Sequence, residues 1–134
     1  MEDEMRREML RAKIHRITVT ERDIHYEGSL TLDSDLMDAA GMVPFERIDV
    51  YNVNNGQRFS TYVIQGEKGS GACCVNGAAA RLAEPGDLLI VASYAHVEYA
   101  EIKTHQPVII VVDSRNRIKE MKEMEEGQKK VKMV

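Results

Sequence analysis

The chain has 134 residues, the size of one ordinary domain, so we expect a single domain spanning 1–134. Hydrophobic residues make up 43% and charged residues 30%, which is typical of a folded globular protein and excludes wholesale disorder. The formal net charge of -4 argues against a nucleic-acid binder, which needs a basic surface to displace counterions.

The sequence contains no segment that predicts export or a membrane span. Its first 13 residues are densely charged, and its longest apolar stretches, near 88–92 and 108–112, are far shorter than the ~20 residues of a membrane helix. The only cysteines, Cys73 and Cys74, are adjacent, which disfavours a disulfide between them, and too few ligands accompany them for a zinc site. We therefore expect a cytoplasmic protein with reduced thiols, no metal, and neither membrane nor nucleic acid as partner.

The N-terminal part of the chain predicts two strands and one short helix. Residues 14–20 are rich in β-branched side chains, which favour a strand. Simple alternation places four side chains on one face of this strand: Lys13, His15, Ile17 and Val19. A second strand at 30–32 leads into a helix that Asp33 or Ser34 caps and Gly41 ends.

A hairpin is the strongest turn signal in the middle of the chain. Residues 47–53 and 57–64 read as strands, and they flank Asn54-Asn55-Gly56, whose Asn-Gly pair tolerates the positive φ angles of a tight turn. A glycine-rich turn at 66–71 then leads to a strand at 72–75.

The remaining sequence alternates turns and strands before a charged tail. Residues 76–82 predict a turn that enters one helical segment, and a Pro-Gly-Asp turn precedes a strand at 88–94. A proline opens a strand at 108–112, and the charged tail, 115–134, predicts a marginal, partly frayed helix with a solvated role. Many short strands with few helices indicate a mainly β protein and favour a small closed β-barrel, because closure removes exposed sheet edges.

Five stretches carry more specific information than any of these elements. They are KIHRITVT (13–20), HYEGS (25–29), NGQRFSTYVI (55–64), VNGAAA (75–80) and PGDLLIVASY (85–94). Together, in this order and at these spacings, they resemble the pyruvoyl-dependent aspartate 1-decarboxylases. The similarity covers roughly residues 9–113.

The resemblance implies both a fold and a covalent cofactor. Such enzymes are homotetrameric, cytoplasmic, six-stranded double-psi β-barrels that make β-alanine from L-aspartate for pantothenate synthesis. Their pyruvoyl group arises from the serine of a Gly-Ser bond, here Gly28-Ser29, so the chain would cut itself into a β chain, 1–28, and an α chain, 29–134. Neither metal nor pyridoxal phosphate would be needed, and a maturation protein would be a further candidate partner.

The family's other functional positions are all occupied as its pattern asks. The resemblance implies that Tyr62 is the proton donor and that Thr61 and Asn76 serve processing. It implies that eight further residues contact substrate: Lys13, His15, Tyr26, Arg58, Gly77, Ala78, Ala79 and Ala80. One departure is Tyr51, where relatives commonly have tryptophan; it would reshape a pocket wall without removing a reacting group.

The chemistry of self-cleavage explains why a glycine and a serine are needed. The Ser29 Oγ must attack the carbonyl carbon of Gly28, and an intramolecular attack in good geometry can replace ~7–11 kcal/mol of barrier. Glycine tolerates the backbone conformations of an exposed, strained bond. The ester then eliminates to dehydroalanine, which hydrolyses to a pyruvoyl group with loss of ammonia. Thr61 and Asn76 would stabilise the oxyanion, where one donor is worth about 2.7–4 kcal/mol.

The chemistry of turnover assigns roles to a tyrosine and to the cations. The ketone at position 29 would form a Schiff base with aspartate and accept electrons as CO2 leaves, and Tyr62 would return a proton. Pairing a cation with the departing α-carboxylate would stabilise the ground state and slow the reaction. We therefore expect Arg58, aided by Lys13 and with His15 as a further candidate, to bind the retained β-carboxylate.

Two questions stay open on the sequence alone. Alternation puts Arg58 and Tyr62 on one strand face and Thr61 on the other, so either the strand is irregular or Thr61 serves a site on its opposite side, which a neighbouring subunit could share. Two other functions compete with the enzyme assignment: a pyruvoyl decarboxylase of another amino acid, and a non-catalytic β-barrel that binds a partner. Two nearby cations favour an acidic substrate.

Overall fold

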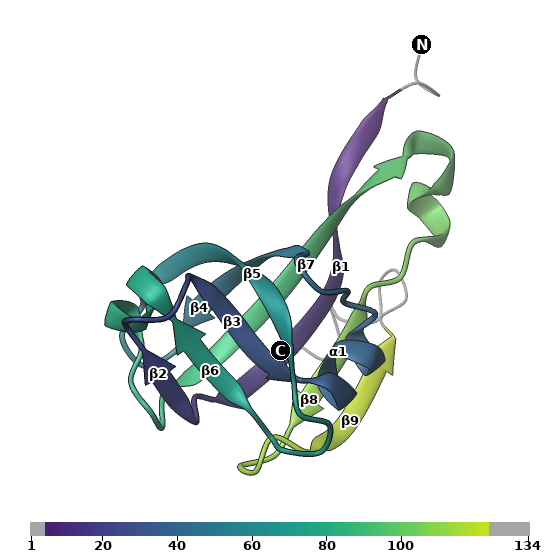
Figure 1. Cartoon of the computed structure of the whole chain (residues 1–134). Coiled ribbons are helices and arrows are strands. Elements are labelled where there is room, and N and C mark those ends of the chain that lie inside the picture. Colours follow the sequence, from purple (N-terminus) through teal and green to yellow (C-terminus); the bar gives the residue numbers. More distant parts are fainter. Residues whose placement is uncertain (1–4, 124–134) are drawn as a thin grey trace.

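The computed structural model describes residues 5–123, which form a mixed nine-stranded sheet with short helices (Figure 1). The expectation of a mainly β chain is confirmed. The strands are β1 (Arg6–Thr18), β2 (Glu21–Asp23), β3 (Ser29–Asp33), β4 (Arg47–Asn52), β5 (Arg58–Gly66), β6 (Cys73–Asn76), β7 (Leu88–Glu98), β8 (Val108–Val112) and β9 (Ile118–Glu123). The helices are α1 (Ser34–Ala40) and two 3-10 helices, η2 (Gly77–Leu82) and η3 (Tyr99–Thr104).

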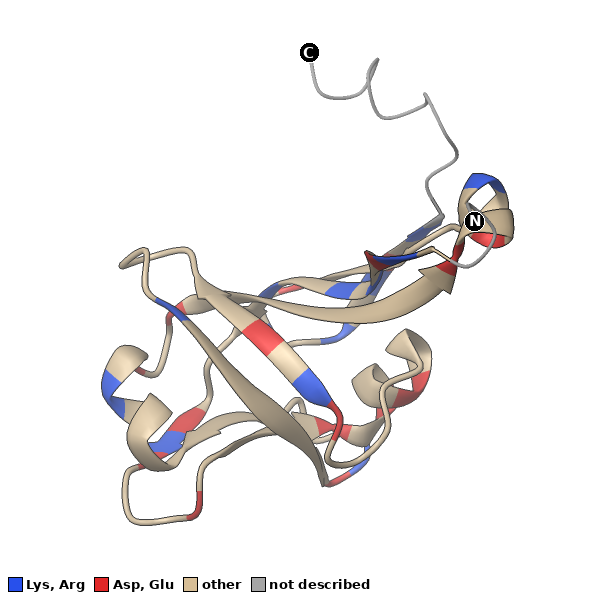
Figure 2. Ribbon diagram, turned by 90° about the horizontal axis from the view of Figure 1, so that it is seen from above, with Lys and Arg blue, Asp and Glu red and all other residues tan. Residues whose placement is uncertain are grey.

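The order of the strands in the sheet differs from their order in the chain. It runs β2-β6-β3-β5-β4-β7-β1-β8-β9, with parallel pairing in β2–β6, β3–β5 and β1–β8. The sheet curls around one hydrophobic core to which most strands contribute, whereas the first half of β1 and the last half of β7 extend outward as a ribbon that carries η3 (Figure 1). Basic and acidic positions are interspersed over these elements (Figure 2). Among the described residues, no helix is long and apolar enough to cross a membrane.

A bulge in β1 overturns the predicted faces of that strand. Arg16 has a φ of 66°, and the register with β7 shifts between His15 and Ile17. The side chains that enter the core are Ala12, Ile14, Ile17 and Val19. Lys13 and His15 therefore share a face away from the core, but the prediction that Ile17 and Val19 join them is wrong, because the extra residue of a bulge reverses the alternation.

The predicted hairpin is confirmed. β4 and β5 pair antiparallel without a register shift, with Arg47 opposite Tyr62 and Tyr51 opposite Arg58. The connecting turn is ordered by Asn52, whose side-chain oxygen accepts a hydrogen bond of 2.9 Å from the Asn54 backbone N–H. Gly56 of the Asn-Gly pair has a φ of 76°, a positive value of the kind that this pair tolerates in a tight turn.

The predicted helix after β3 is also confirmed, and its cap has a second function. The Asp33 carboxylate accepts a hydrogen bond from the Asp35 N–H at 2.8 Å, and Gly41 ends the helix in the left-handed conformation. The same carboxylate accepts hydrogen bonds from the Gly69 and Gly71 N–H groups at 2.9 and 2.8 Å. One buried side chain thus ties the glycine-rich turn to the start of α1.

The predicted helix in the charged tail is wrong for the residues that the structure describes. Ile118–Glu123 form β9, which pairs antiparallel with β8. Asn116 makes this possible: it has a φ of 61° and its buried side chain bonds the Thr18 backbone N–H and C=O at 2.8 Å each. Pairing with the free edge of β8 gives the backbone N–H and C=O groups of this segment hydrogen-bond partners, whereas a short isolated helix is only marginally stable in water. Residues 124–134 of the tail lie outside the described part of the chain.

The Asp33 carboxylate gives the fold a testable dependence on pH. Burial opposes its ionisation, but the three backbone N–H groups outweigh burial and lower its pKa. A carboxyl whose pKa is lower in the folded chain than the unfolded value of about 3.9 stabilises the fold above that pH, and this stabilisation is lost as the pH falls through the folded pKa. Asp33→Asn should lower the free energy of unfolding at pH 7 by about 1.5–3 kcal/mol.

Urea unfolding of Asp33→Asn and of the unchanged chain, at pH 7 and at pH 3, measures this difference in the free energy of unfolding. Asp38→Asn, an exposed carboxylate of the same helix, is the matched control and should change stability by less than about 0.5 kcal/mol. Equal stability of Asp33→Asn and the unchanged chain at pH 7 would contradict the assignment.

Candidate active site

Ser29 begins β3 and is held by a residue from the end of β6. It is buried, with 1% of its surface exposed, and it pairs directly with Asn76 across the antiparallel β3–β6 ladder. Asn76 Nδ2 donates a hydrogen bond of 3.0 Å to the Ser29 Oγ, and that hydroxyl donates a longer bond of 3.4 Å to the Glu27 carbonyl. Two of the predicted site residues are thereby in direct contact.

The Asn76 amide has a fixed orientation because all its polar atoms are used. Nδ2 donates a second bond of 3.0 Å to the Thr31 Oγ1, and Oδ1 accepts a bond of 3.1 Å from the Cys74 Sγ. Burial, with Glu21 and Asp23 nearby, raises the pKa of the Cys74 thiol, so it stays protonated and able to donate. Thr31 and Cys74 pair with each other two residues along the same ladder.

Sequence reasoning missed both of these supporting residues. The signal available for them was strand alternation, since Thr31 lies two residues after Ser29, and Cys74 two residues before Asn76, on one face of neighbouring strands. That signal becomes usable only when the pairing of β3 with β6 is known.

Gly28 lies outside the core, against the start of η2. It is exposed, although Ser29 beside it is buried. Gly77 has a φ of 71°, and a Cβ built on it would lie 2.6 Å from the Gly28 Cα and 3.1 Å from the Tyr26 carbonyl oxygen. Only glycine therefore lets the backbone before Ser29 approach η2 this closely. The Tyr26 side chain is 53% exposed.

The three alanines after Gly77 have different surroundings. Ala78 is exposed and Ala79 half-buried, whereas Ala80 is fully buried in the hydrophobic core. Only the first two present surface on which a substrate could lie.

The pairing of β3 with β5 places Tyr62 beside Ser29. Leu30 is level with Val63 in this parallel pair, so the preceding residues, Ser29 and Tyr62, are neighbours on the face opposite to the core. β5 pairs regularly with β4 from Arg58 to Tyr62, which removes the possibility of an irregular strand. Thr61 faces the other side, and among residues 5–123 its hydroxyl makes no hydrogen bond with Ser29. Continuing the register makes it level with Gly28.

Arg58 lies over an aromatic ring on the outer face of the sheet. Its guanidinium carbon is 4.6 Å from the centroid of the Tyr51 ring, which is a cation–π contact. The Tyr51 hydroxyl is 3.0 Å from that of Tyr94. This hydrogen bond, followed by burial, raises the pKa of Tyr51 to about 12. The ring that supports Arg58 is therefore neutral and held in place.

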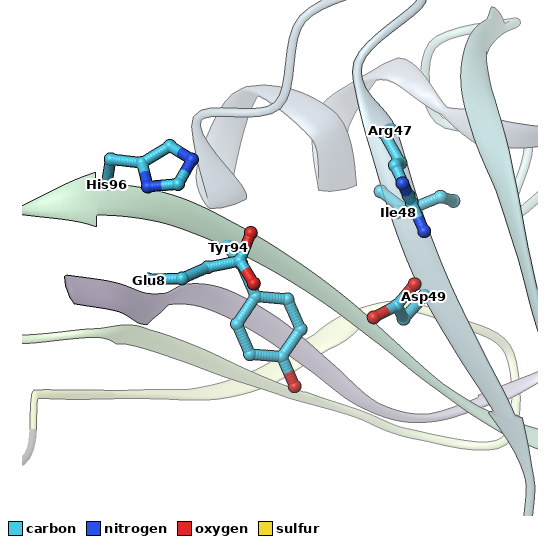
Figure 3. A pocket seen from close by; sticks show the side chains of 6 residues that line it. All are labelled: Glu8, Arg47, Ile48, Asp49, Tyr94 and His96. Carbon is cyan, nitrogen blue, oxygen red and sulfur yellow. The ribbon is translucent and has the colours of Figure 1, made fainter.

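Two adjoining pockets open on this outer face. One, of about 300 Å³, is lined by Arg47, Asp49, Tyr51, Arg58, Phe59 and Ser60. The second, also of about 300 Å³, shares two of these residues, and Figure 3 shows side chains of β1, β4 and β7 gathered round it. It is lined by Glu8, Arg47, Ile48, Asp49, Tyr94 and His96. Charges of both signs line each pocket.

Along the strands and in the sheet order, the three residues predicted to bind the β-carboxylate lie apart from Ser29. Arg58 lies four residues along β5 from Tyr62, about 13 Å at the rise of an extended strand. His15 is opposite Ile90 of β7, and β4 separates β7 from Arg58, so about 14 Å of sheet lies between β1 and β5. Lys13 shares the face of His15.

The surroundings of His15 favour the neutral form of its imidazole. Burial and the nearby charges of Lys13 and Arg16 lower its pKa, and among the described residues its Nδ1 is the buried side-chain polar atom without a hydrogen-bond partner. Such an orphaned atom is uncommon in a folded chain and indicates a place where a ligand or another molecule could bond. Within residues 5–123, no group of three His, Cys, Asp or Glu side chains is arranged to hold a metal ion.

Comparison with known proteins identifies the family of the chain. The model of the family described as aspartate decarboxylase matches residues 5–119. Aspartate 1-decarboxylase of Bordetella avium is 57% identical over 118 residues, which cover 88% of this chain and 97% of the relative. The enzyme of the same name from Cupriavidus taiwanensis is 57% identical over 120 residues, 90% of this chain and 100% of the relative. The chain therefore belongs to the aspartate decarboxylase family.

Proposed function

We propose that the chain cuts itself between Gly28 and Ser29 and then converts L-aspartate to β-alanine and CO2 in the cytoplasm. The observation that carries this proposal is the buried Ser29 Oγ, held at 3.0 Å by Asn76 beside an exposed glycine peptide. The membership of the family supports it, since these enzymes depend on a pyruvoyl group made from a serine.

Self-cleavage needs no reactant other than water. The Ser29 Oγ bonds to the Gly28 carbonyl carbon as the Gly28–Ser29 amide breaks, and the serine nitrogen becomes a free amine. Elimination then removes the Ser29 Cα proton and breaks the Cβ–Oγ bond, so that Oγ leaves within the Gly28 carboxylate. Hydrolysis of the remaining enamine, through its imine, takes oxygen from water and releases ammonia. Asn76 Nδ2 already donates to the Ser29 Oγ, and its dipole favours the negative charge that develops there. Thr61, level with Gly28, is our candidate donor to the carbonyl oxygen.

The residues round position 29 fit a pyruvoyl group. Asn76 Nδ2 donates hydrogen bonds to the Ser29 Oγ and to the Thr31 Oγ1. Tyr62 is the neighbour of Ser29 on the adjacent strand, on the same face of the sheet. When present, the group supplies a carbonyl conjugated to an amide, which accepts the electrons released as CO2 leaves. Tyr62 then returns a proton from its phenol to the substrate carbon.

The placement of the residues proposed to bind the β-carboxylate supports a site shared between subunits. Arg58, Lys13 and His15 would bind the retained β-carboxylate, but Arg58 lies about 13 Å along β5 from the level of Ser29, and β1 is four positions from β3 in the sheet order. In a homotetramer, the outer face of one subunit can supply them to Ser29 of the next. The orphaned Nδ1 of His15 supports an arrangement that is complete only in the assembly.

The strand order supports closure of the sheet into a six-stranded double-psi β-barrel. Beyond the paired strands, the Thr20 N–H donates to the Cys73 carbonyl at 2.9 Å and the Cys73 N–H donates to the Thr20 hydroxyl at 2.9 Å. Thr20 lies between β1 and β2, so these bonds extend the β2–β6 pairing to within two residues of the end of β1, which stands far from β6 in the sheet order. A crystal structure with an open edge between these segments would contradict closure.

Ser29→Ala should abolish both reactions, because neither the ester nor the ketone can then form. Mass spectrometry of the unchanged chain should show fragments 1–28 and 29–134, the second without a free amine and reducible by borohydride, whereas the variant should stay whole. A mature protein that keeps an ordinary serine at position 29 and still releases CO2 from aspartate would refute the proposal. Cleavage only after addition of cell extract would indicate a maturation protein.

Gly77→Ala should slow self-cleavage by at least about tenfold, since its Cβ would push the Gly28 backbone away from η2. Gly56→Ala is the matched control, because that glycine has a similar φ, 76°, and nothing lies within 4 Å of a Cβ built there. The cleaved fraction is followed on denaturing gels. Equal slowing in both variants would mean that backbone strain, and not displacement of Gly28, is responsible.

A mixing experiment tests the shared site and the role of Arg58 together. Ser29→Ala should be inactive and Arg58→Ala should have a strongly raised KM for aspartate, with exposed Arg7→Ala as the neutral control. Co-expressing the first two should restore about a quarter of wild-type activity, the share expected when symmetric sites assemble at random. No recovery would mean that Arg58 serves Ser29 of its own chain or does not bind substrate. A panel of acidic and basic amino acids tests the substrate class.

A further inference from the structure

Phe45 has a positive φ, which is unusual for a bulky residue in a tight turn. Residues Val43–Glu46 form a tight turn closed by a hydrogen bond of 3.1 Å from the Glu46 N–H to the Val43 carbonyl. Pro44 occupies its second position, and Phe45 in the third has a φ of 73°. Turns with a positive φ at this position favour glycine or asparagine. A bulky side chain there is an outlier, and such strain persists where the surrounding structure or the function requires it.

Burial in the core does not explain the phenylalanine. Its side chain is 76% exposed and does not belong to the hydrophobic core cluster, so the ring gains little from removal of apolar surface from water. Neither local propensity nor core packing therefore accounts for this residue type.

The ring contact that Phe45 does make is with Tyr62. The two ring centroids are 6.1 Å apart at an interplanar angle of 40°, within the range of favourable aromatic pairs. The backbone holds this contact in register, because the Phe45 N–H donates to the Val63 carbonyl at 2.7 Å and the Val63 N–H donates to the Glu46 carbonyl at 3.0 Å. Tyr62 thus has Ser29 on its β3 side and, on its β4 side, the turn of Phe45, which directly precedes β4.

We propose that Phe45 is a positioning residue that holds the Tyr62 phenol toward position 29, and that the strained turn is retained for this contact. The inference rests on the proposed role of Tyr62 as proton donor. It explains why a ring stands where the backbone favours a smaller residue. Phe45 itself does not touch the reacting atoms; it acts through Tyr62.

Replacing Phe45 should therefore separate stability from activity. Phe45→Asn relieves the strain of a positive φ and should raise the Tm by about 3–5 °C, but it should lower kcat about tenfold with KM changed by less than about twofold. Phe45→Tyr keeps the ring and should keep both values. Phe45→Gly is the second small variant and should reproduce the loss of kcat.

Two further measurements distinguish positioning from a general effect. In uncleaved Ser29→Ala chains carrying ¹³Cζ-tyrosine, the Tyr62 NMR resonance, assigned by its loss in Tyr62→Phe, should move in Phe45→Asn and stay near its place in Phe45→Tyr. In mature Tyr62→Phe protein, adding Phe45→Asn should lower the residual kcat by less than about twofold, because the two residues act as one unit.

Each other outcome overturns a specific statement. A Tyr62→Phe enzyme with kcat within about twofold of wild type would refute the role of Tyr62 and, with it, the inference. A slow Tyr62→Phe enzyme combined with an unaffected Phe45→Asn enzyme would refute the inference alone. A tenfold loss from Phe45→Asn that persists in the Tyr62→Phe background would mean that Phe45 acts through some other group.

Discussion

The hydrogen bond from Asn76 to Ser29 spans 47 residues of sequence, and the arrangement of the candidate active site depends on it. Thr31 and Cys74 occupy the other polar atoms of the same amide, so the amide cannot turn over without leaving a buried group unpaired. A nucleophile that must attack its own backbone needs one fixed direction of approach. The β3–β6 ladder supplies that direction, because it sets serine and asparagine directly opposite each other.

Departures from regular backbone occur beside the site residues. The bulge at Arg16 follows His15, the left-handed conformation of Gly77 admits the Gly28 backbone, and the turn at Phe45 brings a ring to Tyr62. Regular strands would place side chains only at fixed intervals on two faces, so an irregular residue is the means of redirecting one. The hydrophobic core remains regular and provides the rigid support.

Elements with strong local signals were predictable from the sequence. The Asn-Gly hairpin and the helix between Asp33 and Gly41 were expected from turn and cap chemistry, which acts over a few residues. The faces of β1 were not, because a bulge at a non-glycine residue such as Arg16 has no local signal. The strand at Ile118–Glu123 was also missed: its spacing of apolar residues suits a helix, and only the edge of β8 makes a strand favourable.

The sequence by itself determined the family, through five motifs in order, and therefore which residues we expect to carry the chemistry. Only the tertiary structure decided which of them meet: Ser29 contacts Asn76 and adjoins Tyr62, whereas Arg58 lies about 13 Å away along its strand. The reason is physical. Side-chain chemistry is a local property of a residue, but strand pairing between distant segments is chosen by the whole set of competing contacts and core packing, which no short stretch of sequence contains.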